Sequence, residues 1–211
     1  MYWNLPEMEI AIAEKNIIIR SELLKRDVTC TLLIAEETDF AEPFDLLLLN
    51  DGQETQSLQL KETVEELLSS GRIKPLLVVA IHTNEERLQE YGAAGKPDFK
   101  KRGAKAGLYT EFIKTELLPA VHKLTGIENF GATAFAGFSL GGLSALDIAW
   151  NNADLFDKVG VFSGSFWWRS KDLSKGYTDS QLIEYKKKDM LVSIAKDHSM
   201  IFISKPPHNK F

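Results

Sequence analysis

The five residues Gly137-Phe138-Ser139-Leu140-Gly141 have the G-x-S-x-G spacing of a serine nucleophile held at a sharp turn. Small apolar residues precede the serine, and an apolar pattern with helical spacing follows it without a linker. Where a strand turns directly into a helix, the flanking positions have no room for a β-carbon, and the serine takes strained backbone angles that expose its hydroxyl. We therefore predict that Ser139 is a catalytic nucleophile. The alternative is that the glycines serve only tight packing of a helix on a strand.

A serine that attacks a carbonyl group also needs hydrogen-bond donors for the oxyanion that forms. One donor is the backbone N–H of Leu140, at the start of the predicted helix, where unpaired N–H groups favour negative charge. The second is expected from the backbone N–H of Gln53, because Gly52 permits a tight turn after an apolar run. Asp51, in the same turn, is a further candidate for substrate binding. An ordinary Asp-Gly turn without a catalytic role is the alternative at this position.

The segments around these residues alternate between strand and helix patterns, which predicts an α/β fold in a single domain over residues 1–211. Short apolar runs predict strands buried on both faces, and the first patterns in the chain predict antiparallel strands at an edge. The whole is expected to be a mostly parallel central sheet with helices on both faces and a ligand site at the carboxyl ends of its strands. The predicted buried strands are 44–51, 74–83, 132–139 and 158–164; the antiparallel segments are 7–13, 16–21 and 27–36; the helices are 59–71, 107–126 (kinked at Pro119, ending at Gly126) and 141–150.

The composition narrows the class of protein. The chain has 211 residues, 44% of them apolar, and a net charge of −5, which argues against a nucleic-acid-binding protein. Its single cysteine, Cys30, excludes an intrachain disulfide framework and is expected to fill space in the core. No stretch is long and apolar enough to predict a membrane span, and the first residues lack the pattern of a signal peptide. These features predict a cytoplasmic protein.

The segment 84–107 is a long connection that is rich in Gly, Lys and Arg and follows a predicted strand. It is either a solvated surface loop or a lid over the substrate. As a lid, it would bring positive side chains to the site and favour anionic or polyhydroxylated esters. The candidates for contact with substrate are Arg87, Tyr91, Lys100, Lys101 and Arg102. Beyond the last clear strand, the paired aromatic residues Trp167 and Trp168 either line the substrate cleft or pack in the core beneath a loop.

Five segments together resemble the putative esterase family of α/β-hydrolases, which includes enterochelin esterases, feruloyl esterases and S-formylglutathione hydrolases. They are "LLLLNDGQ", "LLVVAIHTNEERLQEY", "FIKTELLPAVHKLTG", "AGFSLGGLSAL" and "LFDKVGVFSGSFWW", in the family's order from about Lys25 to Trp168. The resemblance is strongest to the enterochelin-esterase-like branch. It implies an α/β-hydrolase fold, Ser139 as the nucleophile, Leu140 and Gln53 as the oxyanion donors, a small-molecule ester as substrate, and no metal or organic cofactor.

The proton-transfer groups that such a serine needs are harder to find. A histidine must accept the serine proton and a carboxylate must orient it, in the chain order Ser, acid, His. Only His198 and His208 follow Ser139, and neither fits the pattern, so no catalytic histidine or acid is assigned. By comparison with the family, the last strand–helix units are expected to be missing. That would leave a sheet edge and an apolar face uncovered, with self-association as the consequence. The predicted activity is therefore that of a serine esterase, with a poorly active or inactive binding protein of the same fold, or a thioesterase or acyltransferase, as alternatives.

Overall fold

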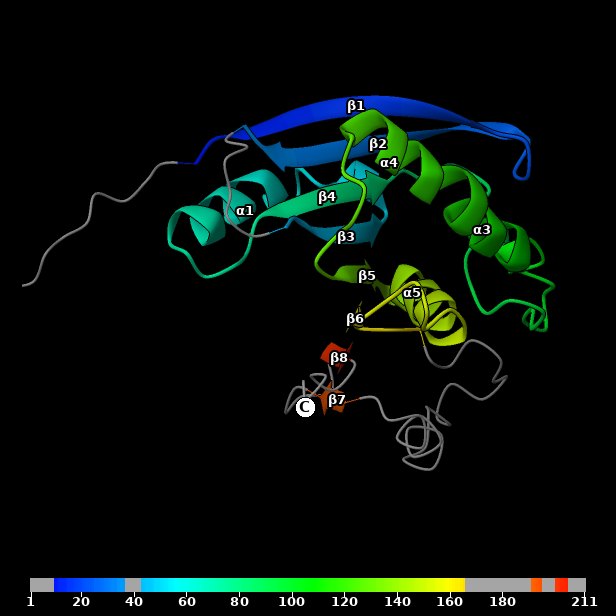
Figure 1. Ribbon diagram of the computed structural model, residues 1–211. Coiled ribbons are helices and arrows are strands. Elements are labelled where there is room, and N and C mark those ends of the chain that lie inside the picture. Colours follow the sequence, from blue (N-terminus) through cyan, green and yellow to red (C-terminus); the bar gives the residue numbers. More distant parts are fainter. Residues whose placement is uncertain (1–9, 37–42, 166–190, 195–199, 205–211) are drawn as a thin grey trace, which may run out of the picture.

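A computed structural model of the chain describes residues 10–36 and 43–165, together with the backbone of two strands at 191–194 and 200–204. In these ranges eight strands form one sheet in the order β1-β2-β4-β3-β5-β6-β8-β7. Figure 1 shows them following one another from β1 at the top to β7 at the bottom. The strands are β1 (Ile12–Ser21), β2 (Arg26–Ala35), β3 (Asp45–Asn50), β4 (Leu76–Ile81), β5 (Thr133–Phe138), β6 (Lys158–Phe162), β7 (Leu191–Ile194) and β8 (Met200–Ser204).

The centre of the sheet is parallel, and its two sides are antiparallel. Strands β4, β3, β5 and β6 pair in parallel, whereas β1 with β2, β2 with β4, β6 with β8 and β7 with β8 are antiparallel. The parallel strands are the apolar runs of the sequence, buried on both faces as predicted. Two differences stand out: residues 12–21 form one continuous strand where two segments were predicted, and β7 and β8 were not anticipated.

Helices cover both faces of the sheet, which confirms the α/β-hydrolase fold class. On one face, α1 (Leu60–Ser69) packs Val64 and Leu68 against residues of β1, β2 and β4. On the other face, a second core cluster joins the strands to the remaining long helices. These are α3 (Ala106–Phe112), η2 (Ile113–Leu117), α4 (Leu118–Thr125) and α5 (Ser139–Asn151), accompanied by two short helices, η1 (Gly52–Glu54) and α2 (Arg87–Glu90).

The segment predicted as one long kinked helix is α3, η2 and α4 in succession. A π-helical turn, η2, lies directly before Pro119, and Gly126 ends the helix in a left-handed conformation with φ 72°. The helical spacing of Phe112, Ile113, Leu117, Val121 and Leu124 predicts one apolar stripe on this segment. Leu117 and Val121 are fully buried, as this stripe predicts. Leu124 is 57% exposed, so its predicted place in that stripe is wrong. In its place, Ile127 and Phe130 after the helix pack against the core.

None of the helices in the described ranges combines the length and the apolar character that crossing a membrane requires.

Leu117 and Leu124 offer a matched test of this packing. We expect Leu117→Ala to lower the free energy of unfolding by about 2–5 kcal/mol, because it leaves a cavity in a filled core. Leu124→Ala is expected to change it by less than about 0.5 kcal/mol, because more than half of that side chain is in solvent. Urea unfolding followed by circular dichroism measures both; equal losses in the two variants would contradict the helix orientation described here.

Candidate active site

Ser139 sits at a sharp turn between a central strand and a helix. Strand β5 ends at Phe138 and α5 begins at Ser139, one residue before Leu140, which was predicted to be the first helical residue. Ser139 has φ 51°, which for a residue other than glycine stores about 1–3 kcal/mol of strain. The residue is exposed, although both neighbours of the turn, Gly137 and Leu140, are buried. The turn therefore presents the serine hydroxyl outside the core.

The glycines of the motif are required by a close backbone approach. A β-carbon at Gly137 would lie 2.5 Å from both the carbonyl carbon and the carbonyl oxygen of Gly141. At Gly142, it would lie 2.8 Å from the carbonyl oxygen of Gly137. Real β-carbons do not come this close to backbone atoms, so any side chain here would force the strand and the helix apart.

A cleft of about 430 Å³ opens beside Ser139, at the carboxyl ends of β3 and β5, where the sheet topology predicts a ligand site. Phe138 forms part of its wall, and the Phe138 ring stacks on Phe162 with the ring centres 4.7 Å apart. The cleft thus joins a hydroxyl, an aromatic wall and a few charges. Its lining consists of Asn50, Asp51, Gln53, Glu54, Ser57, Leu58, Arg87, Phe138 and Ser139.

An ion pair lies at the cleft. Asp51 accepts two hydrogen bonds from Arg87, with Nε to Oδ1 at 2.6 Å and Nη2 to Oδ2 at 2.8 Å. The Arg87 guanidinium also lies over the ring of Tyr91, 5.1 Å from its centre. The hydrogen bonds with Asp51 raise the pKa of Arg87 above its usual value. Asp51 and Arg87, both predicted to contact the substrate, therefore lie at the cleft, but the negative charge of Asp51 balances the positive charge of Arg87.

Tyr91 is connected to the cleft through Asp51. Its side chain is fully buried, and its hydroxyl accepts a hydrogen bond of 3.1 Å from the backbone N–H of Asp51. It does not line the cleft, so the expected direct contact with substrate is replaced by a role in holding Asp51. Asp51 itself has φ 62° and precedes η1, so this hydrogen bond stabilises a strained position at the mouth of the site.

Asn50, the last residue of β3, was not singled out in the sequence although it links three elements. Its amide nitrogen donates to the carbonyl oxygen of Gly141 at 2.8 Å, and its amide oxygen accepts from the Tyr109 hydroxyl at 2.7 Å. Both Asn50 and Tyr109 are buried. The signal in the sequence is a polar residue that ends an uninterrupted apolar run, which typically needs hydrogen-bond partners inside the protein.

The two predicted oxyanion donors belong to different elements: Gln53 to η1, which lines the cleft, and Leu140 to α5, directly after Ser139. Leu140 is the second residue of α5, among the first N–H groups that have no partner within a helix. Gln53 lies in η1, and its side-chain oxygen accepts hydrogen bonds from the N–H and the hydroxyl of Thr83, at 3.1 and 3.3 Å. These contacts fix the turn that carries the Gln53 N–H. Whether the two N–H groups bind an oxyanion stays a prediction.

The Ser139 hydroxyl has a serine, not a histidine, as its neighbour. Its oxygen lies 3.1 Å from the Ser165 hydroxyl oxygen, and in the described part of the chain no histidine nitrogen or carboxylate bonds to it. His198 and His208 lie outside the described residues, as do Trp167 and Trp168. Ser165 lies in the segment "LFDKVGVFSGSFWW", which resembles the family, but its place beside Ser139 was not predicted.

His82, which directly follows β4, is hydrogen-bonded to Thr31. Its Nε2 lies 2.8 Å from the Thr31 hydroxyl, which donates to the Asn16 side chain at 2.7 Å. Burial lowers the pKa of His82, so the ring is neutral at pH 7. The His82 side chain is not among those that line the cleft. His122, on α4, is hydrogen-bonded to the backbone oxygen of Ile127.

Of the loop 84–107, only Arg87 lines the cleft. The rest of the loop is folded on itself and on α5: the buried Asp98 accepts hydrogen bonds from Arg102 and Lys100, and the Ala94 N–H donates to Asp147 on α5. The expected positive lid is therefore not present at the described cleft. The charged side chains that line the cleft are two carboxylates, Asp51 and Glu54, and one guanidinium, that of Arg87.

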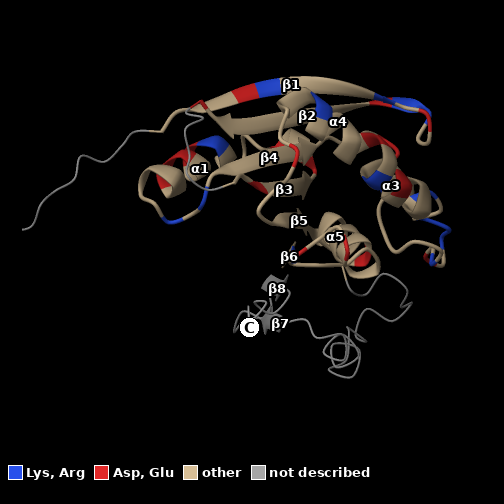
Figure 2. Ribbon diagram, viewed as in Figure 1, with Lys and Arg blue, Asp and Glu red and all other residues tan. Residues whose placement is uncertain are grey.

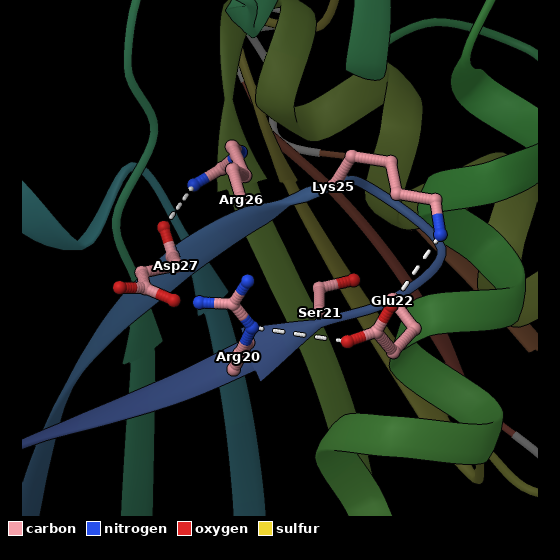
Figure 3. A pocket seen from close by; sticks show the side chains of 6 residues that line it. All are labelled: Arg20, Ser21, Glu22, Lys25, Arg26 and Asp27. Carbon is pink, nitrogen blue, oxygen red and sulfur yellow. Dashed lines mark hydrogen bonds and ion pairs between the residues drawn. The ribbon is translucent and has the colours of Figure 1, made fainter.

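A second hollow, of about 320 Å³, lies at the β1–β2 hairpin (Figure 3). In the order of the sheet, strand β4 lies between this hairpin and the strands β3 and β5 at the cleft. Glu22 is in ion-pair distance of both Arg20 and Lys25, and all three side chains are mostly in solvent. Figure 2 shows charges of both signs gathered at this hairpin, whereas the central strands are largely uncharged. Paired, hydrated charges of this kind contribute little and indicate no particular ligand.

The described residues contain no cluster of three or more His, Cys, Asp or Glu side chains arranged to hold a metal ion. Cys30 is buried in β2, and burial raises the pKa of its thiol to about 12, which agrees with a space-filling role in the core.

The family model described as "Putative esterase" matches residues 21–200 of the chain. The chain belongs to this family. Similar solved structures include the enterochelin esterase of Shigella flexneri, with 24% identity and a TM-score of 0.64 over 86% of this chain and 43% of that one. An IroE-like serine hydrolase of Shewanella oneidensis matches with 24% identity and a TM-score of 0.62, over 75% and 53% of the two chains. The siderophore hydrolase EstB of Aspergillus nidulans matches with 19% identity and a TM-score of 0.56, over 80% and 59%.

At these identities the solved structures establish the fold, and the family supports a general esterase or hydrolase activity. The chain spans about half the length of the solved structures it matches. The comparison with curated proteins found no match.

The close approach at the turn can be tested with two glycines. Gly137→Ala is expected to destabilise the fold by several kcal/mol, about 2–5 by analogy with other overpacked or strained core positions, because the new β-carbon meets the backbone of Gly141. Gly107→Ala, in α3 with nothing within 4 Å of the new atom, is expected to be neutral or stabilising by up to about 1 kcal/mol. Thermal unfolding of both variants measures the difference, and a neutral Gly137→Ala would contradict the described turn.

The environment of His82 predicts a pH dependence. Because burial lowers its pKa in the folded protein, the unfolded chain binds the proton first as the pH falls. This contribution to stability is present above the ordinary histidine pKa of about 6.5 and is lost as the pH falls below it. We expect His82→Gln to lose less stability than the wild type between pH 7.5 and 5.5. Parallel slopes of unfolding free energy against pH in the two proteins would contradict this.

Proposed function

We propose that the chain is a serine esterase in which Ser139 attacks the carbonyl carbon of a carboxylic ester. The observation that carries the proposal is the strained Ser139 at a strand–helix turn, exposed at a cleft next to the first N–H groups of α5, which have no partner within that helix. The Oγ–C bond would form as the ester carbonyl becomes an oxyanion, stabilised by the Leu140 and Gln53 N–H groups. The alcohol then leaves, and water hydrolyses the acyl-enzyme.

The proton of the Ser139 hydroxyl must go to a base, and the described residues do not supply one. Without a base, a serine hydrolase loses on the order of 10⁶ in turnover, while the oxyanion donors and binding still retain roughly 10³-fold over water. The geometry therefore argues for Ser139 as the nucleophile. The full catalytic rate requires, in addition, a base that is not among the described residues.

The cleft favours an ester with an aromatic group next to the scissile bond. Phe138 is partly exposed beside Ser139, and Leu58 extends the apolar wall. A flat aromatic ring can stack on such a wall with little loss of conformational entropy. One similar structure, an enterobactin esterase of Shigella flexneri, was solved in the presence of 2,3-dihydroxy-N-benzoyl-serine, which contains an aromatic ring, and this supports esters of this kind. The charges at the cleft argue against the anionic preference expected from the loop, because Arg87 is paired with Asp51. A cytoplasmic location and self-association remain predictions of the sequence.

A second candidate is a binding protein that keeps the fold and the cleft without turnover. It is favoured by one observation, the absence of a histidine or carboxylate bonded to Ser139 in the described ranges. A ligand would then occupy the same cleft, with Ser139 as one of its polar contacts.

Labelling with a fluorophosphonate separates the two candidates. We expect the probe to modify Ser139 in the wild type and to leave Ser139→Ala unmodified, with mass spectrometry locating the adduct. Turnover of p-nitrophenyl acetate and p-nitrophenyl benzoate, measured in parallel, is expected to disappear in Ser139→Ala and to favour the aromatic ester. Tight binding of the benzoate ester without labelling or turnover would instead support the binding protein.

A further inference from the structure

Two hydrogen bonds connect Ser165 to Ser139, the proposed nucleophile. Its hydroxyl oxygen lies 3.1 Å from the hydroxyl oxygen of Ser139, and its backbone N–H donates to the Ser139 carbonyl oxygen at 3.0 Å. The residue is only 3% exposed, and in the described part of the chain its hydroxyl bonds to no other group. A buried hydroxyl needs a partner, and here that partner is the nucleophile.

The backbone that places Ser165 is strained. Strand β6 ends at Phe162, and Ser163 directly after it has φ 49°, a left-handed conformation that residues other than glycine rarely adopt. The chain turns at this residue and brings Ser165 back to the start of α5. Two serines with positive φ are thus part of this arrangement: Ser139, which carries one of the two facing hydroxyls, and Ser163, which lies two residues before the other. Strain of this kind persists where the surrounding contacts impose it, and it gathers at functional sites.

We propose that Ser165 is a positioning residue for the nucleophile, with its hydroxyl donating a hydrogen bond to the Ser139 oxygen. This rests on the proposed function of Ser139. The hydrogen bond holds the Ser139 side chain in one rotamer and leaves the Ser139 proton pointing away from Ser165, free to be removed. As that proton leaves, the hydrogen bond to the oxygen becomes charge-assisted and therefore stronger. Ser165 keeps its own proton throughout and lowers the cost of forming the alkoxide.

The reaction with a fluorophosphonate tests this role without a natural substrate. In that reaction the Ser139 Oγ–P bond forms, the P–F bond breaks, fluoride leaves and the hydroxyl proton passes to water or buffer. We expect Ser165→Ala to label about 10- to 100-fold more slowly, the usual effect of losing one hydrogen bond to a charged group. Its rate–pH profile is expected to shift to higher pH, because the alkoxide is less stabilised. A purely structural role would not shift that profile.

Three further variants separate the hydroxyl from the packing. Ser165→Thr keeps the donor and is expected to label near the wild-type rate, and Ser165→Cys keeps the volume with a weak donor and is expected to be slow while melting like the wild type. Ser144→Ala removes another buried hydroxyl from α5 and is expected to change nothing in the labelling.

The outcomes that overturn the assignment are distinct from those that overturn the esterase. An unchanged or faster rate in Ser165→Ala or Ser165→Cys, or a Ser165→Thr as slow as Ser165→Ala, would show that the hydroxyl does not assist Ser139. A wild type that is not labelled at all would remove the proposed function of Ser139, and the role of Ser165 with it.

Discussion

The close approach of β5 and α5 is the constraint on which the site depends. Gly137 and Gly141 touch through backbone atoms, at a separation that leaves no space for a side chain. Because the helix starts where the strand ends, the connecting residue must take the turn alone, and Ser139 does so with a positive φ. The same contact places the first N–H groups of α5 beside the serine. Exposure of the hydroxyl and a positive electrostatic environment therefore follow from one packing requirement.

Buried polar residues connect this turn to the rest of the cleft. Asn50 bonds the carbonyl oxygen of Gly141, and Tyr109 bonds Asn50. Tyr91 accepts from the backbone of Asp51, which in turn binds Arg87. Each group lies where an unsatisfied hydrogen bond would be costly, so the network favours one arrangement of β3, α3 and α5. The network thereby supports the cleft on the side that carries Ser139, with the short helix η1 and Arg87 at its mouth.

The sequence predicts what depends on local patterns and misses what depends on distant contacts. The glycine spacing around Ser139 and the apolar runs of the central strands are local, and both lead to the observed elements. The role of Asn50 depends on Gly141, which is 91 positions away, and no local pattern encodes that contact. The charge of the loop 84–107 was a misleading signal for a related reason: composition shows the Lys and Arg residues, but only the fold shows that Asp51 and Asp98 pair with two of them.

In the proposed esterase, the position of the nucleophile and its activation would have separate structural origins. The geometry of Ser139 comes from contacts among β3, β5, α5 and the turn at Ser163, all within residues 45–165. A base would be an additional side chain that approaches the hydroxyl from the open side of the cleft, since Ser165 occupies the buried side. In α/β-hydrolases the base comes later in the chain than the nucleophile, so it does not take part in forming the turn. The turn at Ser139 can therefore fold with its strain in place whatever supplies a base. In the proposed esterase, the rate of proton removal, rather than the position of the serine, would decide how fast the site reacts.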